Sequence, residues 1–394
     1  MNTIYLDNNA TSPIAPEALD DMLPYLKELY GNPSSMHTFG GQLHRKIEDA
    51  RNKVARLLGA DPEEIIFTSC GTESDNTAIM SAVESFPQKR HIVTTRVEHP
   101  AVLNFFKHLA RKGYRVTFLP VSNQGRLNVD DVMKAVGDDT SFVSIMYANN
   151  EIGNIYPIEE IGRLLRERRI LFHTDAVQAV GKIPVDLKTL PVDMLSLSGH
   201  KLHAPKGVGA LYVRKGTRFY PYIIGGHQEN GRRAGTENLA SIIALGKACE
   251  LAMELLEKEV VYLQKLRNRL EDALLRSCPD VRINGDTENR LPNTSNLSFE
   301  YVEGEAILLR LNEYGVCASS GSACTSGSLE PSHVLRAMGV PFTAIHGSIR
   351  FSLSRYNTEA EIDKVIEIMP GIIKNLRELS PFGREKIGQI TKCS

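Results

Sequence analysis

A lysine at the end of an apolar run is the first residue of this sequence that could do covalent chemistry. Lys201 stands in the tetrapeptide SGHK, directly after VDMLSLS. An ammonium group at the edge of a buried strand must be solvated, paired or chemically used, because burying an unpaired charge is costly. Lysines in such places can lose a proton and attack carbonyl carbons to form Schiff bases. On position alone, a solvated loop lysine is the simpler alternative.

A carboxylate closes another apolar run. Asp175 ends RILFHTD, and Gln178 follows three residues later. Asp175 could cap the next helix, which is the commoner use of such a residue. Ligands of open α/β sheets also bind at the carboxyl ends of the strands. An aspartate there is what pyridoxal phosphate (PLP) requires opposite its pyridine nitrogen. His99, in VEHPAV, could likewise cap a helix or lie over a flat cofactor.

The segment EEIIFTSCGTESDN predicts a strand, a short turn at Gly71 and a helix that opens near Thr72. Free N–H groups and the positive end of a helix dipole make such a turn suitable for a phosphate group. The chain contains neither G-x-x-x-x-G-K-[ST] nor G-x-G-x-x-G. A nucleotide P-loop is therefore excluded, and a dinucleotide site is disfavoured.

Two arginines occur in the run GSIRFSLSR near the carboxyl end of the sequence. Arg350 lies among apolar residues, where a guanidinium group is costly unless it meets a carboxylate. Bidentate pairing with a carboxylate makes Arg350 a candidate substrate anchor. Arg355 is nearer the end of the run and is expected at the solvated surface.

Glycine, serine and alanine crowd the segment ASSGSACTSGSLEPSHVL around Cys324. Such residues pack poorly, which predicts a mobile loop with an exposed thiol. An exposed thiol is an oxidation liability unless chemistry uses it. The other cysteines are expected to be inert: Cys70, Cys249 and Cys278 buried, Cys317 structural and Cys393 incidental in a tail.

These residues need a scaffold that brings strand ends together. Seven short apolar runs alternate with helical segments: EEIIFTS, RHIVTTR, RVTFLPV, SFVSIMYA, RILFHTDA, VDMLSLS and VGALYVR. The alternation predicts βαβ units and a mostly parallel sheet covered on both faces. An amphipathic stretch from about Leu239 to Ser277 predicts a long helix that leads into a smaller α+β domain. We expect a large domain at 15–258 and a small one at 259–394, the latter joined by the N-terminal arm 1–14.

Composition limits the class of protein. The chain has 394 residues, is 42% hydrophobic and carries a formal net charge of -1, which excludes disorder and gives no reason to expect nucleic acid or an anionic membrane as partner. No apolar run reaches the ~18 residues of a membrane span. The first residues lack the features of a secretory signal. Six scattered cysteines without CxxC spacing fit a reduced cytoplasm. We therefore expect a cytoplasmic globular protein.

Nine motifs, in order, resemble the NifS/IscS-type cysteine desulfurases, which are class-V aminotransferases with the fold-type I architecture of PLP enzymes. The motifs are YLDNNAT, SCGTESDN, VEHPAV, NNEIG, HTDAVQ, SGHK, RAGTEN, SSGSACTSGSLEPSHVLRAMG and SIRFSLSR. The match as a whole extends from about residue 4 to about residue 382. The combination of SGHK with SSGSACTS is typical of the long-loop class of this family. The resemblance implies a PLP-dependent transferase that takes sulfur from L-cysteine. Its products would be L-alanine and an enzyme persulfide, whose sulfur serves iron–sulfur cluster assembly.

The resemblance also implies a role for each site residue. Lys201 would bind PLP and act as base, Cys324 would take up the sulfur, and His99 would stack on the ring and move protons. Asn150 and Arg350 would bind the substrate. The persulfide on Cys324 would transiently ligate an iron–sulfur cluster, which is the one metal site implied. The implied cofactor-binding residues are Gly71, Thr72, His99, Asn150, Asp175, Gln178, Ser198, Gly199, His200, Lys201 and Thr236.

Within that set, Asp175 would pair with the pyridine nitrogen and Gln178 with the phenolic oxygen. The phosphate would be held by Gly71, Thr72, Ser198 and His200. Thr236 would reach the phosphate of the neighbouring subunit's cofactor, which implies a homodimer. A NifU/IscU-like iron–sulfur scaffold protein is the implied sulfur acceptor, with neither nucleic acid nor a membrane as partner.

Two short motifs refine the branch, and rival activities remain on the same fold. Cys70-Gly71 and DNNAT resemble the nitrogen-fixation branch, NifS, which implies a role in nitrogenase clusters; a general role in cluster assembly is the alternative. An aminotransferase needs no thiol at Cys324, and a catalytically inactive module that binds a sulfur carrier would not need Lys201 or Asp175. Selenocysteine lyase activity stays open beside cysteine desulfurase activity.

Overall fold

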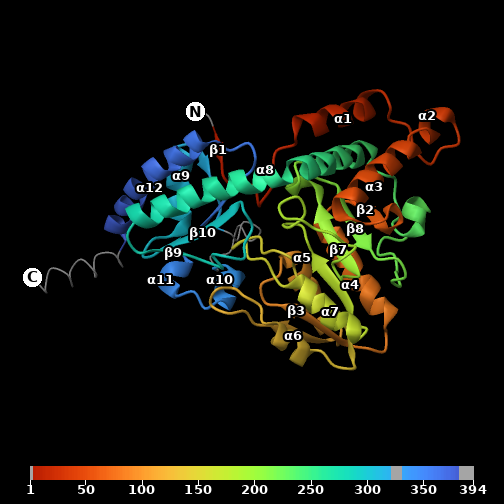
Figure 1. Cartoon of the computed structure of the whole chain (residues 1–394), viewed down its shortest axis with the longest axis horizontal. Coiled ribbons are helices and arrows are strands. Elements are labelled where there is room, and N and C mark those ends of the chain that lie inside the picture. The colour runs from red at the N-terminus through yellow and green to blue at the C-terminus, as the bar shows by residue number, and fades with distance from the viewer. Residues whose placement is uncertain (1–2, 321–330, 381–394) are drawn as a thin grey trace, which may run out of the picture.

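The computed structural model describes residues 3–320 and 331–380 and places them in a large and a small body (Figure 1). A helix of 39 residues, α8 (Leu239–Ser277), runs from one body into the other. At 1.5 Å per residue this helix is about 58 Å long. The predicted long helix is confirmed with the same bounds. Within the described ranges, no helix is both long and apolar enough to cross a membrane.

A seven-stranded sheet forms the middle of the large body. Strand β8 runs antiparallel to both of its neighbours, and all other neighbours are parallel. The short 3-10 turn η2 (Gly199–Lys201) follows β7 in place of a crossover helix, so the chain returns antiparallel. The predicted, mostly parallel sheet is confirmed. Its strands in spatial order are β2 (Ile65–Thr68), β8 (Gly209–Val213), β7 (Met194–Ser198), β6 (Leu171–Asp175), β5 (Thr140–Ser144), β3 (His91–Thr95) and β4 (Arg115–Leu119).

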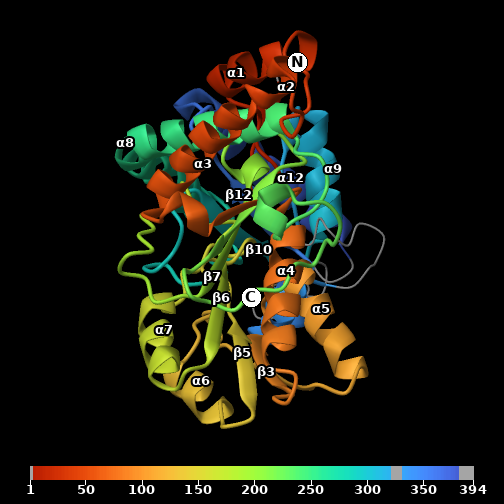
Figure 2. The same ribbon diagram turned by 90° about the vertical axis from the view of Figure 1, so that its right-hand side faces the viewer.

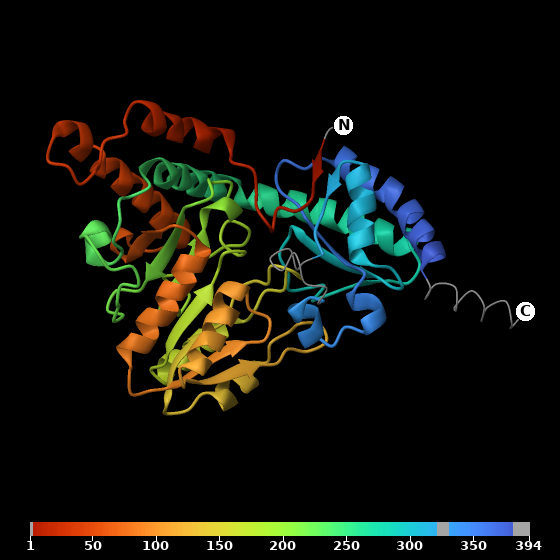
Figure 3. The same ribbon diagram turned by 180° about the vertical axis from the view of Figure 1, so that it is seen from behind.

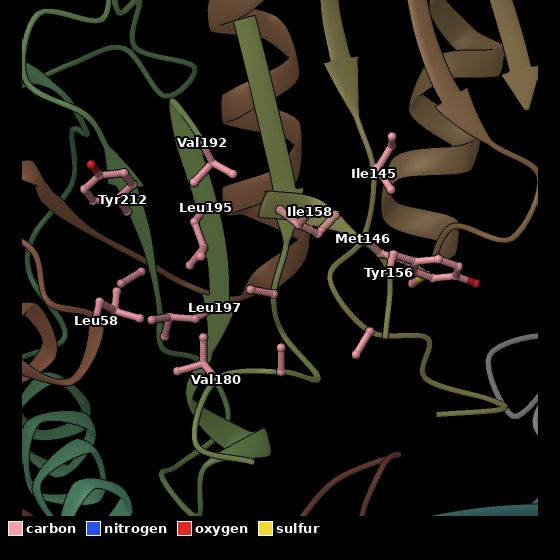
Figure 4. Packing of buried hydrophobic residues seen from close by; sticks show 14 of the residues in the cluster. Leu58, Ile145, Met146, Tyr156, Ile158, Val180, Val192, Leu195, Leu197 and Tyr212 are labelled. Atoms are coloured by element: carbon pink, nitrogen blue, oxygen red, sulfur yellow. The ribbon is translucent and has the colours of Figure 1, made fainter. Parts of the chain in front are cut away.

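Helices cover both faces of this sheet (Figure 2). On one face, α4 (Gly71–Ser85) and α5 (Pro100–Arg111) bury apolar residues such as Ile79 and Phe106. On the other face lie α3 (His44–Leu58), α6 (Val129–Ala135), α7 (Ile158–Glu167) and the first part of α8. Figure 4 shows Leu195 and Leu197 of β7 in this second cluster, with Leu58 and Val180 nearby. The remaining elements of the large body are α1 (Pro16–Lys27), α2 (Thr38–Gly41), η1 (Pro62–Glu64) and η3 (Gln228–Gly231).

The small body is an antiparallel sheet packed against helices. Its strands are ordered β12 (Ser348–Ser352), β10 (Thr294–Phe299) and β9 (Val281–Ile283). A separate core, which includes Leu266, Phe299 and Phe351, lies between this sheet and the helices. An α+β unit beside the α/β one was predicted, and the fold class is confirmed. The helices of this core are the second part of α8, α9 (Gly304–Glu313) and α12 (Glu359–Leu379). Buried residues of α10 (His333–Ala337) and α11 (Phe342–Ile345), such as Val334 and Ala344, belong instead to the core of the large body.

The N-terminal arm connects the two bodies, as Figure 3 shows from behind. Strand β1 (Ile4–Tyr5) pairs in parallel with β11 (Val316–Cys317) of the small body. The Asn8 N–H then donates to the Ser352 carbonyl at 3.0 Å, and the Ser12 N–H donates to the His200 carbonyl of the large body, also at 3.0 Å. Residues between these two attachments therefore lie where the bodies meet.

Candidate active site

A cavity of about 370 Å³ lies at the carboxyl ends of β6 and β7. Ten of the site residues predicted from the sequence line it. Its lining consists of Asn9, Ala10, Cys70, Gly71, Thr72, Asp75, His99, Met146, Ala148, Asn150, Asp175, Val177, Gln178, Ser198, His200, Lys201 and Arg350. Two larger hollows occur, one between α1 and α3 and one on the small body, and neither contains a predicted site residue.

Lys201 reaches into this cavity from the turn η2. Its Nζ donates to the carbonyl oxygens of Asn9 at 2.5 Å and Ala10 at 2.7 Å. Both acceptors belong to the N-terminal arm, so the arm holds the amine at the cavity wall. These contacts exclude the alternative of a solvated loop lysine. An amine held beside a cavity by two neutral acceptors is placed to react with a carbonyl compound.

Asp175 ends β6 and accepts the Val177 N–H at 2.9 Å, so it both shapes the following turn and lines the cavity. Burial raises its pKa, and the Val177 N–H and nearby Lys201 oppose that rise. A second buried carboxyl, Asp75 of α4, was not anticipated from the sequence. Burial and the charge of Asp175 raise the pKa of Asp75 well above its ordinary value. The two carboxyls therefore resist ionising together.

His99 caps α5, which was one of the two uses considered for it, and it also lines the cavity. Its Nδ1 accepts the Ala101 N–H at 3.2 Å. In the neutral ring the proton is then on Nε2. Burial lowers the pKa of His99 to about 4, and Lys201 and His333 act in the same direction. At neutral pH the ring is uncharged and carries one N–H donor.

The N-terminus of α4 forms one wall of the cavity. Its N-cap Cys70 has an extended backbone and makes no side-chain capping hydrogen bond. The first N–H groups of an α-helix lack partners inside the helix, so they are suited to an anion. A Cβ on Gly71 would lie 2.8 Å from Cγ2 of Val177. Only glycine therefore leaves this wall undistorted.

Arg350 is 2% exposed on β12, where burial demands a partner. One Nη donates to Oδ1 of Asp7 at 2.7 Å, and the other donates to the Asn150 carbonyl at 2.9 Å. Its Nε is buried and has no hydrogen-bond partner among the described residues. The carboxylate that the sequence analysis required is present, but it belongs to the N-terminal arm.

Gln178 and His200 complete the polar lining. Nε2 of Gln178 donates to the Asn9 carbonyl at 3.0 Å, and its Oε1 accepts from Nζ of Lys182 at 2.5 Å. Nδ1 of His200 lies 3.1 Å from the Thr11 hydroxyl. Burial lowers the pKa of His200 to about 4, so this ring is also neutral.

The cavity matches the chemistry of PLP. It offers an amine, a buried carboxylate and a helix N-terminus, which suit the aldehyde, the pyridine nitrogen and the phosphate of that cofactor. The tight approach of the Val177 side chain to Gly71 leaves no room for a side chain at the start of α4, so a small group can approach the backbone there. The residues present therefore fit PLP.

Some predicted residues lie elsewhere. Thr236 is exposed and outside the cavity of its own chain. Gly199 is buried in η2 and does not line the cavity; a Cβ there would lie 2.8 Å from Cγ1 of Val208. The prediction that Arg355 is solvated was wrong, because its side chain is 13% exposed and its Nε lies 2.9 Å from Glu259. Cys324 and its implied cluster site lie outside the described residues.

The cysteines that the structure describes are free thiols. Cys249 and Cys278 are buried as predicted, and burial raises the pKa of Cys249 to about 12. Cys317 is half-buried in β11. Cys70 departs from the prediction of a buried residue, because it is half-buried and lines the cavity. Cys393 lies outside the described ranges.

Four residues of the site were missed by the sequence analysis. Asp7, Asn9 and Ala10 come from the arm, whose NNAT turn was noticed without a place in the site. Asp75 follows Gly71 by one helical turn, so its spacing alone could have placed it on the same wall. Apart from this spacing, the indication that Asp75 belongs to the site is weak, because polar residues near the start of a helix are common.

Comparisons with known proteins agree with this geometry. The aminotransferase class-V family matches residues 4–365. A cysteine desulfurase of Trichormus azollae is 61% identical over 388 residues, which cover 98% of this chain and 97% of that protein. Cysteine desulfurase NifS of Azotobacter vinelandii is 57% identical and covers 97% of this chain and 95% of its own length.

A solved structure described as a NifS-like protein has a TM-score of 0.90 and 41% sequence identity, and the match covers 95% of this chain and 100% of that one. The fold, the family match and the sequence identity over nearly the whole chain thus all indicate the same family. The chain belongs to the aminotransferase class-V family, among its NifS/IscS-type cysteine desulfurases.

Proposed function

We propose that this protein removes sulfur from L-cysteine with PLP as cofactor and forms L-alanine and a persulfide on its own cysteine. The observation that carries the proposal is the meeting of Lys201, Asp175 and Arg350 in one cavity. These supply a carbonyl-reactive amine, a buried carboxylate and a guanidinium group for an amino acid's carboxylate. Near full-length identity to cysteine desulfurases supports the choice of substrate.

The cofactor would be held at both ends. Lys201 would attach it covalently, Asp175 would bond its pyridine nitrogen, and His99 would stack on its ring. Gln178 and Asn150 would approach the phenolic oxygen. The phosphate would be bound by Gly71, Thr72, Ser198 and His200, with Thr236 contributed by the partner subunit. When bound, PLP supplies a ring that accepts the electrons left at the substrate's Cα.

The substrate carboxylate would bind Arg350 beside Asn150. Nε of Arg350 has no hydrogen-bond partner among the described residues, and each Nη donates one hydrogen bond within them. Guanidinium retains enough N–H groups for a carboxylate while Asp7 and the Asn150 carbonyl hold it in place. The arginine would therefore be oriented before the substrate arrives.

Proton movement would fall to Lys201 and His99. The amine of Lys201, when free, would accept the proton from the substrate's Cα, with the Asn9 and Ala10 carbonyls as its hydrogen-bond acceptors. The neutral His99 ring would offer its Nε2 proton, because Nδ1 is committed to the helix. The free amine of Lys201 can accept a proton and the neutral ring of His99 can donate one without a prior change in protonation.

Sulfur would pass to Cys324. Its thiolate would attack the substrate sulfur, forming a new S–S bond as the substrate's C–S bond breaks. The C–S electron pair stays with the carbon, which takes a proton to become the methyl group of L-alanine. No external oxidant is needed, because the enzyme thiol and the substrate thiol together yield alanine and a persulfide.

We also propose two protein partners, a cellular location and a division into domains. A homodimer would cover exposed apolar residues of the large body such as Tyr30, Met36 and Ile224. A NifU/IscU-like scaffold protein would accept the sulfur, with transient cluster binding at Cys324 and service to nitrogenase clusters. Free thiols at Cys70, Cys249 and Cys278 fit a cytoplasmic location. The domain division at 258/259 is supported by the core of the small body, which consists of residues from Leu263 onward and of Ile4 and Leu6 in the arm. Val334 and Leu335, which follow that boundary, pack in the core of the large body.

The test is the visible spectrum of the purified protein after incubation with PLP, recorded before and after addition of L-cysteine. We expect a visible absorbance band from bound PLP that changes with cysteine while alanine and sulfide appear. The control is the Lys201→Ala variant. It should show no turnover and should retain PLP more weakly than the wild type does. A wild-type protein that binds PLP but forms no alanine from cysteine would overturn the proposed function.

A further inference from the structure

A second lysine lies behind the active site without a part in the chemistry above. Lys182 follows Gln178 by four residues, and its Nζ donates to Oε1 of Gln178 at 2.5 Å. Lys182 and Lys201 both line a small void of about 30 Å³ that Glu259, His203 and Arg355 also line. The amine of Lys182 therefore lies beside Gln178 at this void and outside the lining of the cofactor cavity.

This contact decides which way the Gln178 amide is turned. A lysine amine can only donate here, so it must face the amide oxygen. The Asn9 carbonyl can only accept, so it must face the amide nitrogen, which it meets at 3.0 Å. The orientation of the amide is thus fixed by two partners of opposite character and needs no assumption about which atom is nitrogen.

The Asn9 carbonyl takes one N–H of this amide, which leaves the second N–H without a hydrogen-bond partner among the described residues. Gln178 also lines the cofactor cavity. If the amide turned over, its oxygen would face the Asn9 carbonyl and its nitrogen the lysine, and both contacts would become repulsive. A turned amide would also direct an acceptor in place of a donor toward the cavity.

We propose that Lys182 is a positioning residue that locks the Gln178 amide with an N–H directed into the cofactor cavity. This inference rests on the proposed function, because the acceptor of that N–H is the phenolic oxygen of bound PLP. Lys182 touches neither cofactor nor substrate and acts through Gln178.

The charges around Lys182 agree with a role as hydrogen-bond donor. Burial lowers the pKa of Lys182 well below its ordinary value, and Lys201 and Arg350 act in the same direction. The amine donates to Oε1 in either protonation state. The carboxylate of Glu259 and the ring of His203 line the void beside it, and the Arg355 guanidinium pairs with Glu259.

The fixed orientation of the Gln178 amide is expected to affect the visible absorbance of bound PLP. A donor to the phenolic oxygen stabilises its anionic form and so lowers the pKa of the PLP chromophore that is attached to Lys201. When Gln178 is released, this donor is lost and the chromophore holds its proton to higher pH.

The experiment is a pH titration of the visible absorbance of the PLP-loaded protein without substrate. We expect Lys182→Met to raise the apparent pKa of the chromophore by about one unit. Lys188→Met, at an exposed lysine of the same segment, should leave it unchanged. If Lys182→Met does not fold, Lys182→Leu takes its place with the same expectation.

A double variant separates action through Gln178 from a direct effect of charge. Gln178→Ala alone should raise the chromophore pKa, and adding Lys182→Met should raise it no further. An unchanged pKa in Lys182→Met, or an undiminished shift in the Gln178→Ala background, would overturn the inference. A wild-type protein without any PLP absorbance would instead overturn the proposed function.

Discussion

Arg350 donates a hydrogen bond to Asp7 at 2.7 Å, although the two residues stand 343 positions apart. The pair joins the N-terminal arm to β12, and the second Nη of Arg350 donates to the Asn150 carbonyl of the large body. Three segments are thus tied together at one buried guanidinium group. An arginine held in this way presents its remaining donors to the cavity in a single orientation.

Arg350→Ala should raise the KM for cysteine far more than it disturbs cofactor absorbance. The loss of a bidentate ion pair with the substrate carboxylate corresponds to about 2–4 kcal/mol, or roughly 30- to 1000-fold in kcat/KM. Arg355→Ala is the matched control, because Arg355 is also buried and paired but lies outside the cavity. It should lower the melting temperature and leave KM unchanged. An unaltered KM in Arg350→Ala would remove this residue from the site.

Gly71→Ala should weaken PLP binding by about ten- to a hundredfold, a loss comparable to other cases of overpacking. The added Cβ would lie 2.8 Å from Cγ2 of Val177. The double variant Gly71→Ala/Val177→Ala removes that contact and should recover most of the affinity. Fluorescence titration with PLP measures both. Gly371→Ala, where no atom lies within 4 Å of the new Cβ, should bind PLP normally. Failure of the double variant to recover affinity would show that the close contact is not the cause.

Glu98→Gln should become progressively more stable than the wild type as pH rises. Burial raises the pKa of Glu98 from 4.5 to about 8, so the folded state keeps a proton that the unfolded chain releases. Between these two values the wild type loses up to about 1.4 kcal/mol of unfolding free energy per pH unit. The glutamine variant does not titrate and serves as reference. Thermal unfolding across that pH range measures the difference, and a pH-independent difference would contradict a protonated Glu98.

Cys324→Ser should separate cofactor chemistry from sulfur transfer. A serine hydroxyl is essentially un-ionised at neutral pH and cannot attack sulfur. The variant should bind PLP normally, and its spectrum should still change with L-cysteine. Alanine and sulfide should not accumulate, and mass spectrometry of the protein should find no persulfide.

Replacement of the other cysteines tests the same assignment from the opposite side. Variants at Cys249, Cys278, Cys317, Cys393 and Cys70 should largely retain turnover, with Cys70 the most informative because it lines the cavity. If Cys324→Ser made alanine at the native rate while one of these did not, the sulfur acceptor would be that other cysteine.

Several of the residues predicted from the sequence follow an apolar run whose end can be recognised locally. Asp175 and Lys201 follow β6 and β7 in this way, and ligands of open sheets bind at such ends. Gly71 is recognisable as the turn between a strand and a helix. The seven strands and α8 were predictable for the same reason, since their hydrophobic period is local.

The missed residues act through contacts that no local pattern encodes. Asn9 and Ala10 serve the site with backbone carbonyls, 192 and 191 positions away from Lys201, and any residue type has such a carbonyl. Asp75 lies inside a helix that is buried on most sides, and the hydrophobic period of that helix does not reveal the burial of a polar residue. Arg355 was misplaced because its partner, Glu259, lies on α8.

The pairing of β1 with β11 can form only late in protein synthesis, because the two strands lie far apart in the sequence. The strand that emerges first, Ile4–Tyr5, has its partner at Val316–Cys317, and Asn8 binds Ser352. At about 5–20 residues per second, the first strand waits tens of seconds for that partner to be translated. Until then the carbonyls of Asn9 and Ala10 are not held beside Lys201. A nascent chain stalled before β11 therefore carries a finished seven-stranded sheet with an unfinished cofactor site, so PLP capture is expected only near the end of synthesis.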